Sequence, residues 1–304
     1  MPCVSIGIPV YNGEKHLSKA IESILAQTYQ DFEIIISNNA STDGTDEICR
    51  DFARSDRRIR HFLQSENLGA ARNFNIVFEL SRGKYFKWTG YDDWLAPEFL
   101  ARCVTVLDND PSLALCYCHE GHYSRDGCFV CSLDQPHNVT SSRAATRFRQ
   151  MLWSRSSIDL TYAVVRRRAL LETSLISTLL GADDILAAEL SLAGRFAHIN
   201  ERISFRTAQP RADEERMDRI EPSPKSTRCQ FTRACIEYAR IIKRAKLKVS
   251  ERTMLLIDLA AFFSCAQIRR RVLGLDGGRV CPESLRRVHN GLYEMKTGGS
   301  KDAA

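Results

Sequence analysis

Apolar runs and amphipathic stretches alternate along the N-terminal part of the chain. Four runs rich in β-branched and aromatic residues predict strands, at 4–10, 32–36, 58–63 and 84–88. Three stretches with apolar residues at helical spacing predict the helices between them, at 14–27, 45–53 and 69–80. Strands that alternate with helices of this length predict βαβ units and a mostly parallel sheet, which binds ligands beyond the carboxyl ends of its strands.

Polar residues follow the first, second and fourth predicted strands. Because the carboxyl ends of parallel strands meet at one edge, we expect Asn12, Asn38 and Asp92 to reach the same bound molecule. Asp92 and Asp93 form an acidic pair there, and hard divalent cations such as Mg²⁺ are often held by one or two carboxylates together with substrate phosphates. Taken alone, such a pair is also typical of a solvated turn or a helix cap.

Several motifs occur in a fixed order along this part of the chain. They lie at residues 9–14, 27–34, 39–45 and 67–73, and Asp92-Asp93 follows them. In this order they resemble the nucleotide-sugar half of the family 2 glycosyltransferases, closely over residues 3–105 and more loosely to about 207. The resemblance implies an α/β GT-A (Rossmann-like) fold, with a mostly parallel sheet flanked by helices and, here, a C-terminal helical extension.

The resemblance also implies an activity. Members of the family transfer a sugar from a nucleotide-diphosphate donor to an acceptor hydroxyl, usually with inversion at the anomeric carbon. Asp93 is implied as a ligand of Mn²⁺ or Mg²⁺, and Asp92 as a ligand of the metal or the ribose. A cation on the diphosphate stabilises the charge that develops on the leaving group. The acceptor class stays open, since a glycan, a lipid-linked molecule and a small molecule are all compatible.

Further residues are implied to bind the substrates. Tyr11 is expected beside the nucleobase, Asn38 at the base edge and Arg72 near the base or diphosphate. Arg206 is the expected diphosphate clamp at the end of the catalytic domain, and Trp94 is the candidate for the acceptor cleft. The same motifs add three donor-binding candidates, Pro9, Asn12 and Asn39.

Two positions depart from the family pattern. Asn38 is an amide where relatives usually have a carboxylate, and an amide donates hydrogen bonds as well as accepting them. Gly90 stands where many relatives carry the first acid of an Asp-X-Asp-Asp string. These departures leave open a catalytically inactive relative that binds nucleotide or glycan. A nucleotidyltransferase on a similar sheet is disfavoured, because residues 11–14 do not form a Gly-rich basic phosphate loop.

The catalytic base is expected near the start of a later helix. Residues 181–196 resemble the acidic motif that closes the acceptor site in the family, and counting back from 190–194 assigns Asp183 as the base, with Asp184 as the alternative. A helix dipole stabilises an anion at this position. The competing interpretation is that Asp183 is a helix N-cap without a chemical role.

The cysteines allow two interpretations. Cys116, Cys118, Cys128 and Cys131 have the composition of a zinc site, but alternation over 113–118 and a turn at 125–127 favour a hairpin with packed cysteines. The chain has eleven cysteines, an odd and irregularly spaced set, and no recognisable signal peptide. This pattern predicts reduced thiols and a cytoplasmic location.

The C-terminal part has a different character. We expect a catalytic domain over 1–207, a linker over 208–227 and a basic helical region over 228–304 that ends in a disordered tail. Its predicted helices are 229–248, 251–271 and 282–295. Their basic side chains contribute to the net charge of +6: Arg240, Lys243, Arg244, Lys246, Lys248, Arg269, Arg270 and Arg271.

Two interpretations of these basic helices remain open. They are suited to peripheral contact with an anionic membrane, or they form a cap with a solvated basic face. The apolar segment 254–268 is too short to span a bilayer. Nucleic-acid binding is not expected, because no recognised motif accompanies the basic residues. The separate basic run 166–168 is expected to be a solvated face.

Overall fold

The computed structural model describes residues 1–124, 127–133, 139–153, 160–179, 181–207 and 227–272. The chain divides into two compact units, Met1–Leu259 and Ala260–Ala304. The expected linker at 208–227 lies almost wholly outside the described residues, as do the expected helix at 282–295 and the expected tail. The predicted domain boundary at 207 therefore stays a prediction.

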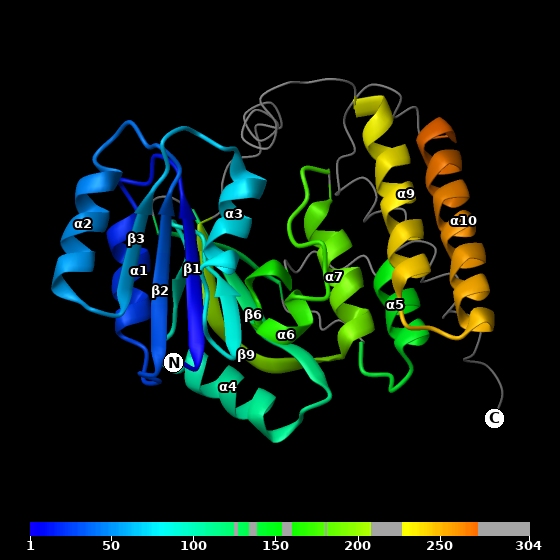
Figure 1. Cartoon of the computed structure of the whole chain (residues 1–304), viewed down its shortest axis with the longest axis horizontal. Helices are drawn as coiled ribbons and strands as arrows, with labels where there is room; N and C mark the ends of the chain where they lie inside the picture. The colour runs from blue at the N-terminus through cyan, green and yellow to red at the C-terminus, as the bar shows by residue number, and fades with distance from the viewer. Residues whose placement is uncertain (125–126, 134–138, 154–159, 180, 208–226, 273–304) are drawn as a thin grey trace, which may run out of the picture. The chain divides into compact units, whose positions relative to one another are not determined.

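The first half of the sheet is parallel. Its elements are β1 (Val4–Val10), α1 (Leu17–Leu25), β2 (Phe32–Asn38), α2 (Thr45–Ser55), β3 (Ile59–Leu63), α3 (Ala70–Glu79) and β4 (Tyr85–Trp88). The strands lie in the order β3-β2-β1-β4, and all three neighbouring pairs are parallel (Figure 1). This half confirms the predicted βαβ units.

The second half of the sheet is mixed. Its elements are β5 (Trp94–Leu95), α4 (Phe99–Asn109), β6 (Leu113–Tyr123), β7 (Phe129–Leu133), α5 (Ala144–Trp153), the 3₁₀ turn η1 (Leu160–Tyr162), β8 (Val164–Arg166), α6 (Arg167–Leu170), α7 (Ala182–Ala193) and β9 (Arg195–Thr207). β8 is antiparallel to both β4 and β6, and β9 is parallel to β6. The predicted fold class, α/β with a sheet flanked by helices, is confirmed.

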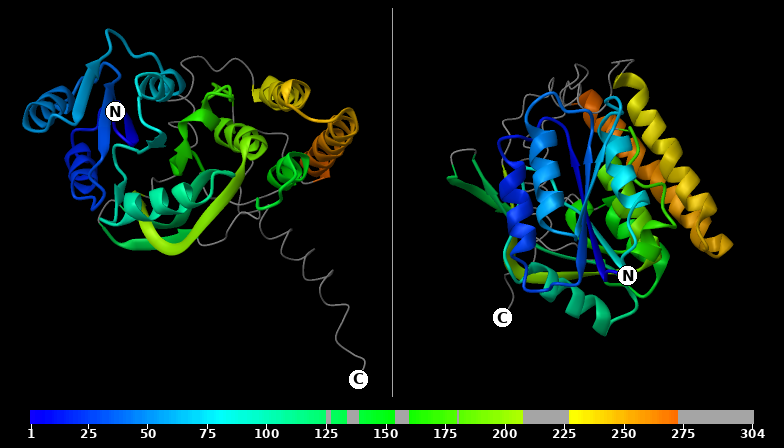
Figure 2. Two further views of the ribbon diagram at one scale, coloured as in Figure 1. Left: turned by 60° about the horizontal axis from the view of Figure 1, so that its bottom comes forward. Right: turned by 60° about the vertical axis from the view of Figure 1, so that its left-hand side comes forward.

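The sheet is buried on both faces: every residue of β1 and β2 is buried, including the polar Ser5 and Glu33. On one face, β1 packs against the buried side chains of α1 and α4. On the other face lies α3, and it approaches so closely that a Cβ at Gly7 would stand 2.5 Å from Val77 Cγ2. Figure 2 shows helices on both sides of the strands. Trp88 is fully buried and donates from Nε1 to the Phe74 carbonyl at 2.8 Å.

The expected solvated face at 166–168 is wrong for Arg166. This residue is buried in β8, and its guanidinium donates to the carbonyls of Leu113 at 2.7 Å and Asp110 at 3.0 Å. It therefore ties together the turn between α4 and β6. A run of three arginines does not reveal this role, since only the register of β8 between β4 and β6 turns one of them inward.

The cysteine-rich segment forms the predicted hairpin. β6 and β7 pair antiparallel, and Cys131 lies opposite His122. Cys116 and Cys118 are buried in the core, whereas Cys128 and Cys131 are exposed. Within the residues that the structure describes, no group of three or more His, Cys, Asp or Glu side chains is placed to hold a metal ion. The interpretation as packed core residues therefore holds for Cys116 and Cys118 but not for Cys128 and Cys131.

Two long helices follow in the C-terminal part, α9 (Thr227–Arg244) and α10 (Val249–Val272). The C-terminal helical extension is thus confirmed. Ile241 and Ile242 of α9 are buried, and Asp258 of α10 forms an ion pair with Arg149 of α5 at 3.2 Å. No helix within the described ranges is long and apolar enough to cross a membrane.

Candidate functional site

The polar rim of the sheet is built by loops that hydrogen-bond to one another. β1 and β2 end level, with Val10 opposite Asn38. Asn12 adopts a positive φ of 53°, a conformation that asparagine tolerates better than most residues. Its side-chain Oδ1 accepts from the Thr42 N–H at 2.9 Å, and its own N–H donates to Ser41 Oγ at 2.9 Å. The loops after β1 and β2 are thereby held as one unit.

Asn38 and Asn39 brace this rim. Asn38 Oδ1 accepts from the Ser41 N–H at 3.0 Å, and its Nδ2 donates to Asp46 Oδ1 at 3.4 Å. Asn39 makes the equivalent pair of bonds to residues 67 and 68, at 2.7 and 2.9 Å. A carboxylate at 38 could not donate and would face that of Asp46, which gives a physical reason for the amide. Contact of these amides with a nucleotide stays a prediction.

The other donor candidates are spread along the same edge. Pro9 is buried in β1 opposite Ser37 of β2, and Tyr11 stands just past β1 with 40% of its surface exposed. Arg72, on α3, pairs with Glu79 seven residues later at an exposed position. The structure thus brings Tyr11 and the amides to one rim, while the roles of Pro9, Tyr11 and Arg72 in donor binding stay predictions.

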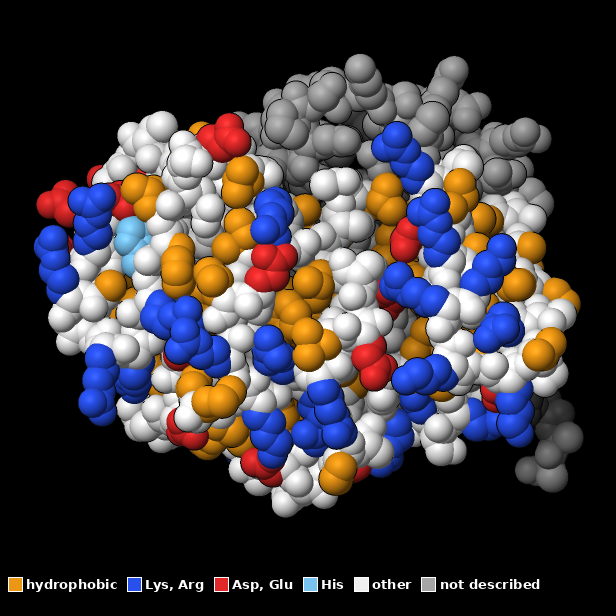
Figure 3. Space-filling model, viewed as in Figure 1, with side chains coloured by type: hydrophobic (Ala, Val, Ile, Leu, Met, Phe, Trp, Pro, Cys, Tyr) orange, Lys and Arg blue, Asp and Glu red, His pale blue; other side chains and the backbone are white. Residues whose placement is uncertain are grey.

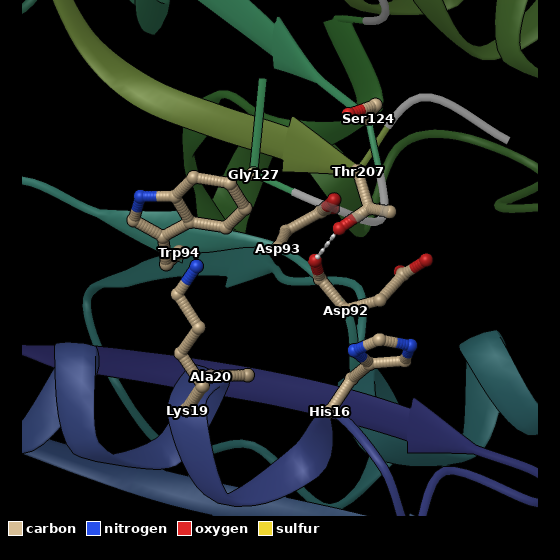
Figure 4. A pocket seen from close by; sticks show the side chains of 9 residues that line it. All are labelled: His16, Lys19, Ala20, Asp92, Asp93, Trp94, Ser124, Gly127 and Thr207. Atoms are coloured by element: carbon tan, nitrogen blue, oxygen red, sulfur yellow. Dashed lines mark hydrogen bonds between the residues drawn. The ribbon is translucent and has the colours of Figure 1, made fainter. Parts of the chain in front are cut away.

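The acidic pair lies in a cleft between α1 and the end of β9 (Figure 4). The loop from β4 to β5 is pinned there, because Thr207 Oγ1 donates to the Asp92 carbonyl at 2.6 Å. The cleft has an empty volume of about 360 Å³, and these residues line it: His16, Lys19, Ala20, Asp92, Asp93, Trp94, Ser124, Gly127 and Thr207.

Asp93 is buried beneath the cleft. Arg206 lies between two acids, with its Nε 3.8 Å from Asp93 Oδ2 and another of its guanidinium nitrogens 3.8 Å from Glu120 Oε2. Burial raises the pKa of Asp93 to about 7; Arg206 opposes this rise, and Asp92 and Glu120 add to it. The folded carboxyl holds its proton to about pH 7 and the unfolded one only to about pH 4, so its contribution to folding stability falls as the pH rises between them.

The absence of a side chain at Gly90 provides the space in which the Asp93 carboxylate lies. A Cβ on Gly90 would stand 2.5 Å from Asp93 Oδ2 and 3.2 Å from Asp92 Oδ1. A side chain at position 90 would therefore have to displace the Asp93 carboxylate from this arrangement.

We expect Gly90→Ala to displace both carboxylates and to destabilise the fold by about 1–3 kcal/mol through overpacking. Thermal unfolding measures the loss of stability. The double variant Gly90→Ala/Asp93→Ala removes the closest collision and should regain stability. A single variant with unchanged melting would contradict this account.

Trp94 is part of a stack of aromatic side chains. Phe205 of β9 stacks on it at 5.8 Å, and Lys19 Nζ lies 3.4 Å from its ring centroid. Figure 4 shows Lys19 beside the indole. An acceptor sugar would have to displace Lys19 to stack on the ring, so the predicted acceptor role of Trp94 stays untested.

Asp183 and Asp184 lie in the first turn of α7 and are not among the residues that line this cleft. The N-cap interpretation is wrong, because the N-cap residue is Gly181, with a φ of 76°. The first-turn position still favours a carboxylate anion through the helix dipole.

Sequence reasoning did not find three groups near the acidic pair: Lys19, Lys87 and Glu120. Glu120 lies in β6 and Lys87 in β4, and no motif marks either of them in the sequence. Lys87 is fully buried, which lowers its pKa, and its Nζ donates to the Tyr162 carbonyl.

Comparison with known proteins decides the family. A family model described as "Glycosyl transferase family 2" matches residues 5–172, more than half of the 304 residues. The chain belongs to this family. Among its relatives, glycosyltransferase GlyA of Streptococcus pneumoniae is 35% identical over 97 residues, 32% of this chain and 14% of GlyA. Chondroitin synthase of Escherichia coli is 34% identical over 130 residues, 43% of this chain and 19% of that enzyme. The aligned segments thus span under a fifth of these two relatives.

Solved structures show the fold of this family 2 chain. S. aureus TarS 1-349, in complex with UDP-GlcNAc, superposes with a TM-score of 0.66 at 16% identity, covering 86% of this chain and 72% of TarS. The mannosyltransferase PcManGT of Pyrobaculum calidifontis, in complex with GDP-Man and Mn²⁺, gives 0.56 at 18% identity, covering 96% and 80%. The predicted GT-A architecture is confirmed.

Proposed function

We propose that this chain is an inverting glycosyltransferase that moves a sugar from a nucleotide-diphosphate donor to an acceptor hydroxyl. The observation that carries the proposal is the acidic pair Asp92-Asp93, held at the carboxyl end of β4 in a cleft of a family 2 chain. The named ligands of TarS and PcManGT, UDP-GlcNAc and GDP-Man, are sugars of this donor class.

The residues of the acidic loop fit a divalent cation. Carboxylate oxygens are hard ligands, and one or two of them with a diphosphate suffice for Mn²⁺ or Mg²⁺. Asp92 lines the cleft. Burial raises the pKa of Asp93 and so opposes its ionised form, whereas a nearby cation would favour that form. We assign both residues to the metal, which when bound would neutralise charge on the departing diphosphate. PcManGT was solved with Mn²⁺.

The chain's own residues account for the remaining steps. Asp183 would accept the proton of the acceptor hydroxyl as its oxygen attacks the anomeric carbon, and Asp184 is the alternative base. A single displacement of this kind inverts the anomeric centre. Tyr11 and Arg72 would hold the donor from the rim, and Arg206 would turn toward the diphosphate from its place between Asp93 and Glu120.

Peripheral membrane contact remains part of the proposal. Basic residues near the end of α9 and in the following turn are exposed: Arg240, Lys243, Arg244, Lys246 and Lys248. Figure 3 shows basic side chains interspersed with apolar ones on the face that carries α9 and α10. Such a surface suits anionic headgroups near a lipid-linked acceptor. The side chains of Arg269, Arg270 and Arg271, which the sequence also places in the basic region, are outside what the structure describes.

A thermal-shift screen of UDP, GDP, CDP and ADP, with and without Mn²⁺, tests the donor site. One nucleotide at about 100 times its Kd should raise the melting temperature by on the order of 5 °C, and only with metal. No stabilisation by any of them would contradict the proposal. The second candidate is an inactive relative that binds a nucleotide, and it is supported by Gly90, which stands where many relatives carry an acid. Metal-dependent stabilisation by a nucleotide, without sugar transfer from the matching sugar nucleotide, would favour this candidate.

A further inference from the structure

A buried glutamate lies next to the proposed diphosphate clamp. Glu120 is in β6, only 4% of its surface is exposed, and its Oε2 lies 3.8 Å from a guanidinium nitrogen of Arg206. This oxygen accepts no hydrogen bond from any residue that the structure describes. A buried carboxylate is costly unless a positive charge compensates it, and the Arg206 guanidinium supplies such a charge.

The pairing of two strands fixes this contact. β6 and β9 are parallel, with Glu120 opposite Ser204 and His122 opposite Arg206. Since alternate residues of a strand point to the same side of a sheet, these four side chains project from one face. His122 is a second basic side chain at the carboxylate, with its Nε2 3.5 Å from Glu120 Oε2. The contact between Glu120 and Arg206 is therefore set by the register of the sheet.

The guanidinium of Arg206 is held from two further sides. Its Nε lies 3.8 Å from Oδ2 of Asp93, and its Cζ lies 4.3 Å from the ring centroid of Tyr162. The Tyr162 carbonyl in turn accepts from Nζ of Lys87, which is buried. Arg206 thus lies between two buried acids and against an aromatic face, an arrangement that favours a cation.

The two acids differ in what else they would bind. Asp93 is assigned to the metal in the proposed function, so its charge would be shared with a divalent cation. Because like charges repel, Arg206 would then lose most of its attraction to this acid. Glu120 belongs to β6 and is not among the residues that line the cleft around the acidic pair. Its charge would therefore remain available to Arg206 with or without the metal.

We propose that Glu120 is a positioning residue for Arg206. It keeps the guanidinium beside the acidic loop, from which Arg206 reaches the donor diphosphate. This inference rests on the proposed function, in which Arg206 contacts the diphosphate and Asp93 binds the metal.

The first test is Glu120→Gln in the full chain, which keeps the shape of the side chain and removes its charge. Titration calorimetry at saturating Mn²⁺ measures the Kd of whichever of UDP, GDP, CDP and ADP gives the largest thermal shift. We expect this Kd to rise about 10-fold, the size of one contact to a charged group, with partial recovery in Glu120→Asp. A charge effect alone has the opposite sign, since removing a nearby carboxylate should tighten the binding of an anion. Unchanged or tighter binding would overturn the inference.

Glu33→Gln is the matched control. Glu33 is also a buried glutamate of the sheet, and its Oε2 lies 3.0 Å from a guanidinium nitrogen of Arg60. Its replacement should lower the melting temperature and leave the diphosphate Kd unchanged, which separates general destabilisation from lost positioning. An equal loss of affinity in Glu33→Gln and Glu120→Gln would count against a specific role for Glu120 and overturn the inference.

The second test asks whether Glu120 acts through Arg206. Arg206→Met should raise the same Kd about 10- to 100-fold, and Glu120→Gln in that background should cause no further loss. A further loss equal to that of Glu120→Gln alone would show that Glu120 acts by another route and would overturn the inference. Wild-type affinity in Arg206→Met would remove the clamp and with it the role of Glu120. Failure of the wild-type chain to bind any of the four diphosphates is a distinct result, against the proposed donor site itself.

A third variant covers the case in which Glu120→Gln does not fold. Tyr162→Leu removes the ring against which the guanidinium lies and leaves both carboxylates in place. The diphosphate Kd should rise about 3- to 10-fold, as for loss of a cation–π contact. A folded Tyr162→Leu chain with wild-type affinity would show that the held position of Arg206 does not matter for binding and would overturn the inference.

Discussion

Asp92→Asn is expected to lower kcat by about 1000-fold or more, because it removes a charged oxygen ligand from a site that must stabilise a departing diphosphate. Asparagine keeps the size of the side chain and the backbone carbonyl that accepts from Thr207. The fold should therefore survive with a melting temperature near that of the parent. Release of nucleoside diphosphate from the matching sugar nucleotide measures the rate.

Two companion variants make this result interpretable. Asp51→Asn, at an exposed position of α2 paired with Arg54, is the matched control and should leave the rate unchanged. Asp93→Asn should weaken activation by Mn²⁺ if the buried acid shares the metal. Full metal-dependent turnover by Asp92→Asn would refute the assignment of this residue.

Asp183→Asn is expected to lower kcat by about 10²- to 10⁴-fold, the usual range for loss of a general base. The donor KM should stay the same, since Asp183 is not among the residues lining the cleft around the acidic pair. Steady-state kinetics with both substrates varied separate these effects.

Asp184→Asn provides the internal comparison, because it removes the same charge one residue further along α7. We expect it to keep kcat within about threefold. A larger loss in Asp184→Asn than in Asp183→Asn would transfer the role of the base to Asp184. Equal, small losses in both would place the base on another element.

Local patterns in the sequence were sufficient to predict most of the strands and helices of the N-terminal half. The strands β1 and β2 are mostly apolar runs because both faces of the sheet are covered, and such runs are visible without a structure. The positions of Asp92 and Asn38 followed from the rule that parallel strands end at one edge. The predicted helix boundaries in α3 and α10 were right to within two residues, since amphipathic spacing defines them.

Contacts between residues far apart in the sequence could not be predicted from it. The inward turn of Arg166 depends on its register against strands far away in the sequence, and nothing in three consecutive arginines distinguishes the buried one. The same holds for Glu120, which meets Arg206 only because β6 and β9 pair in parallel. The lack of space at Gly90 depends on the side-chain conformation of Asp93, which a motif comparison does not contain.

The bond between Thr207 and the Asp92 carbonyl joins positions 115 residues apart. A recombinant hybrid that grafts the N-terminal hundred residues onto another scaffold would keep the motifs from residue 9 to Asp93, yet would cut this attachment. Shuffling of such enzymes therefore has to exchange the terminal residues of β9 together with the acidic loop. The conformation of the acidic loop in this chain consequently depends on two separate stretches of gene.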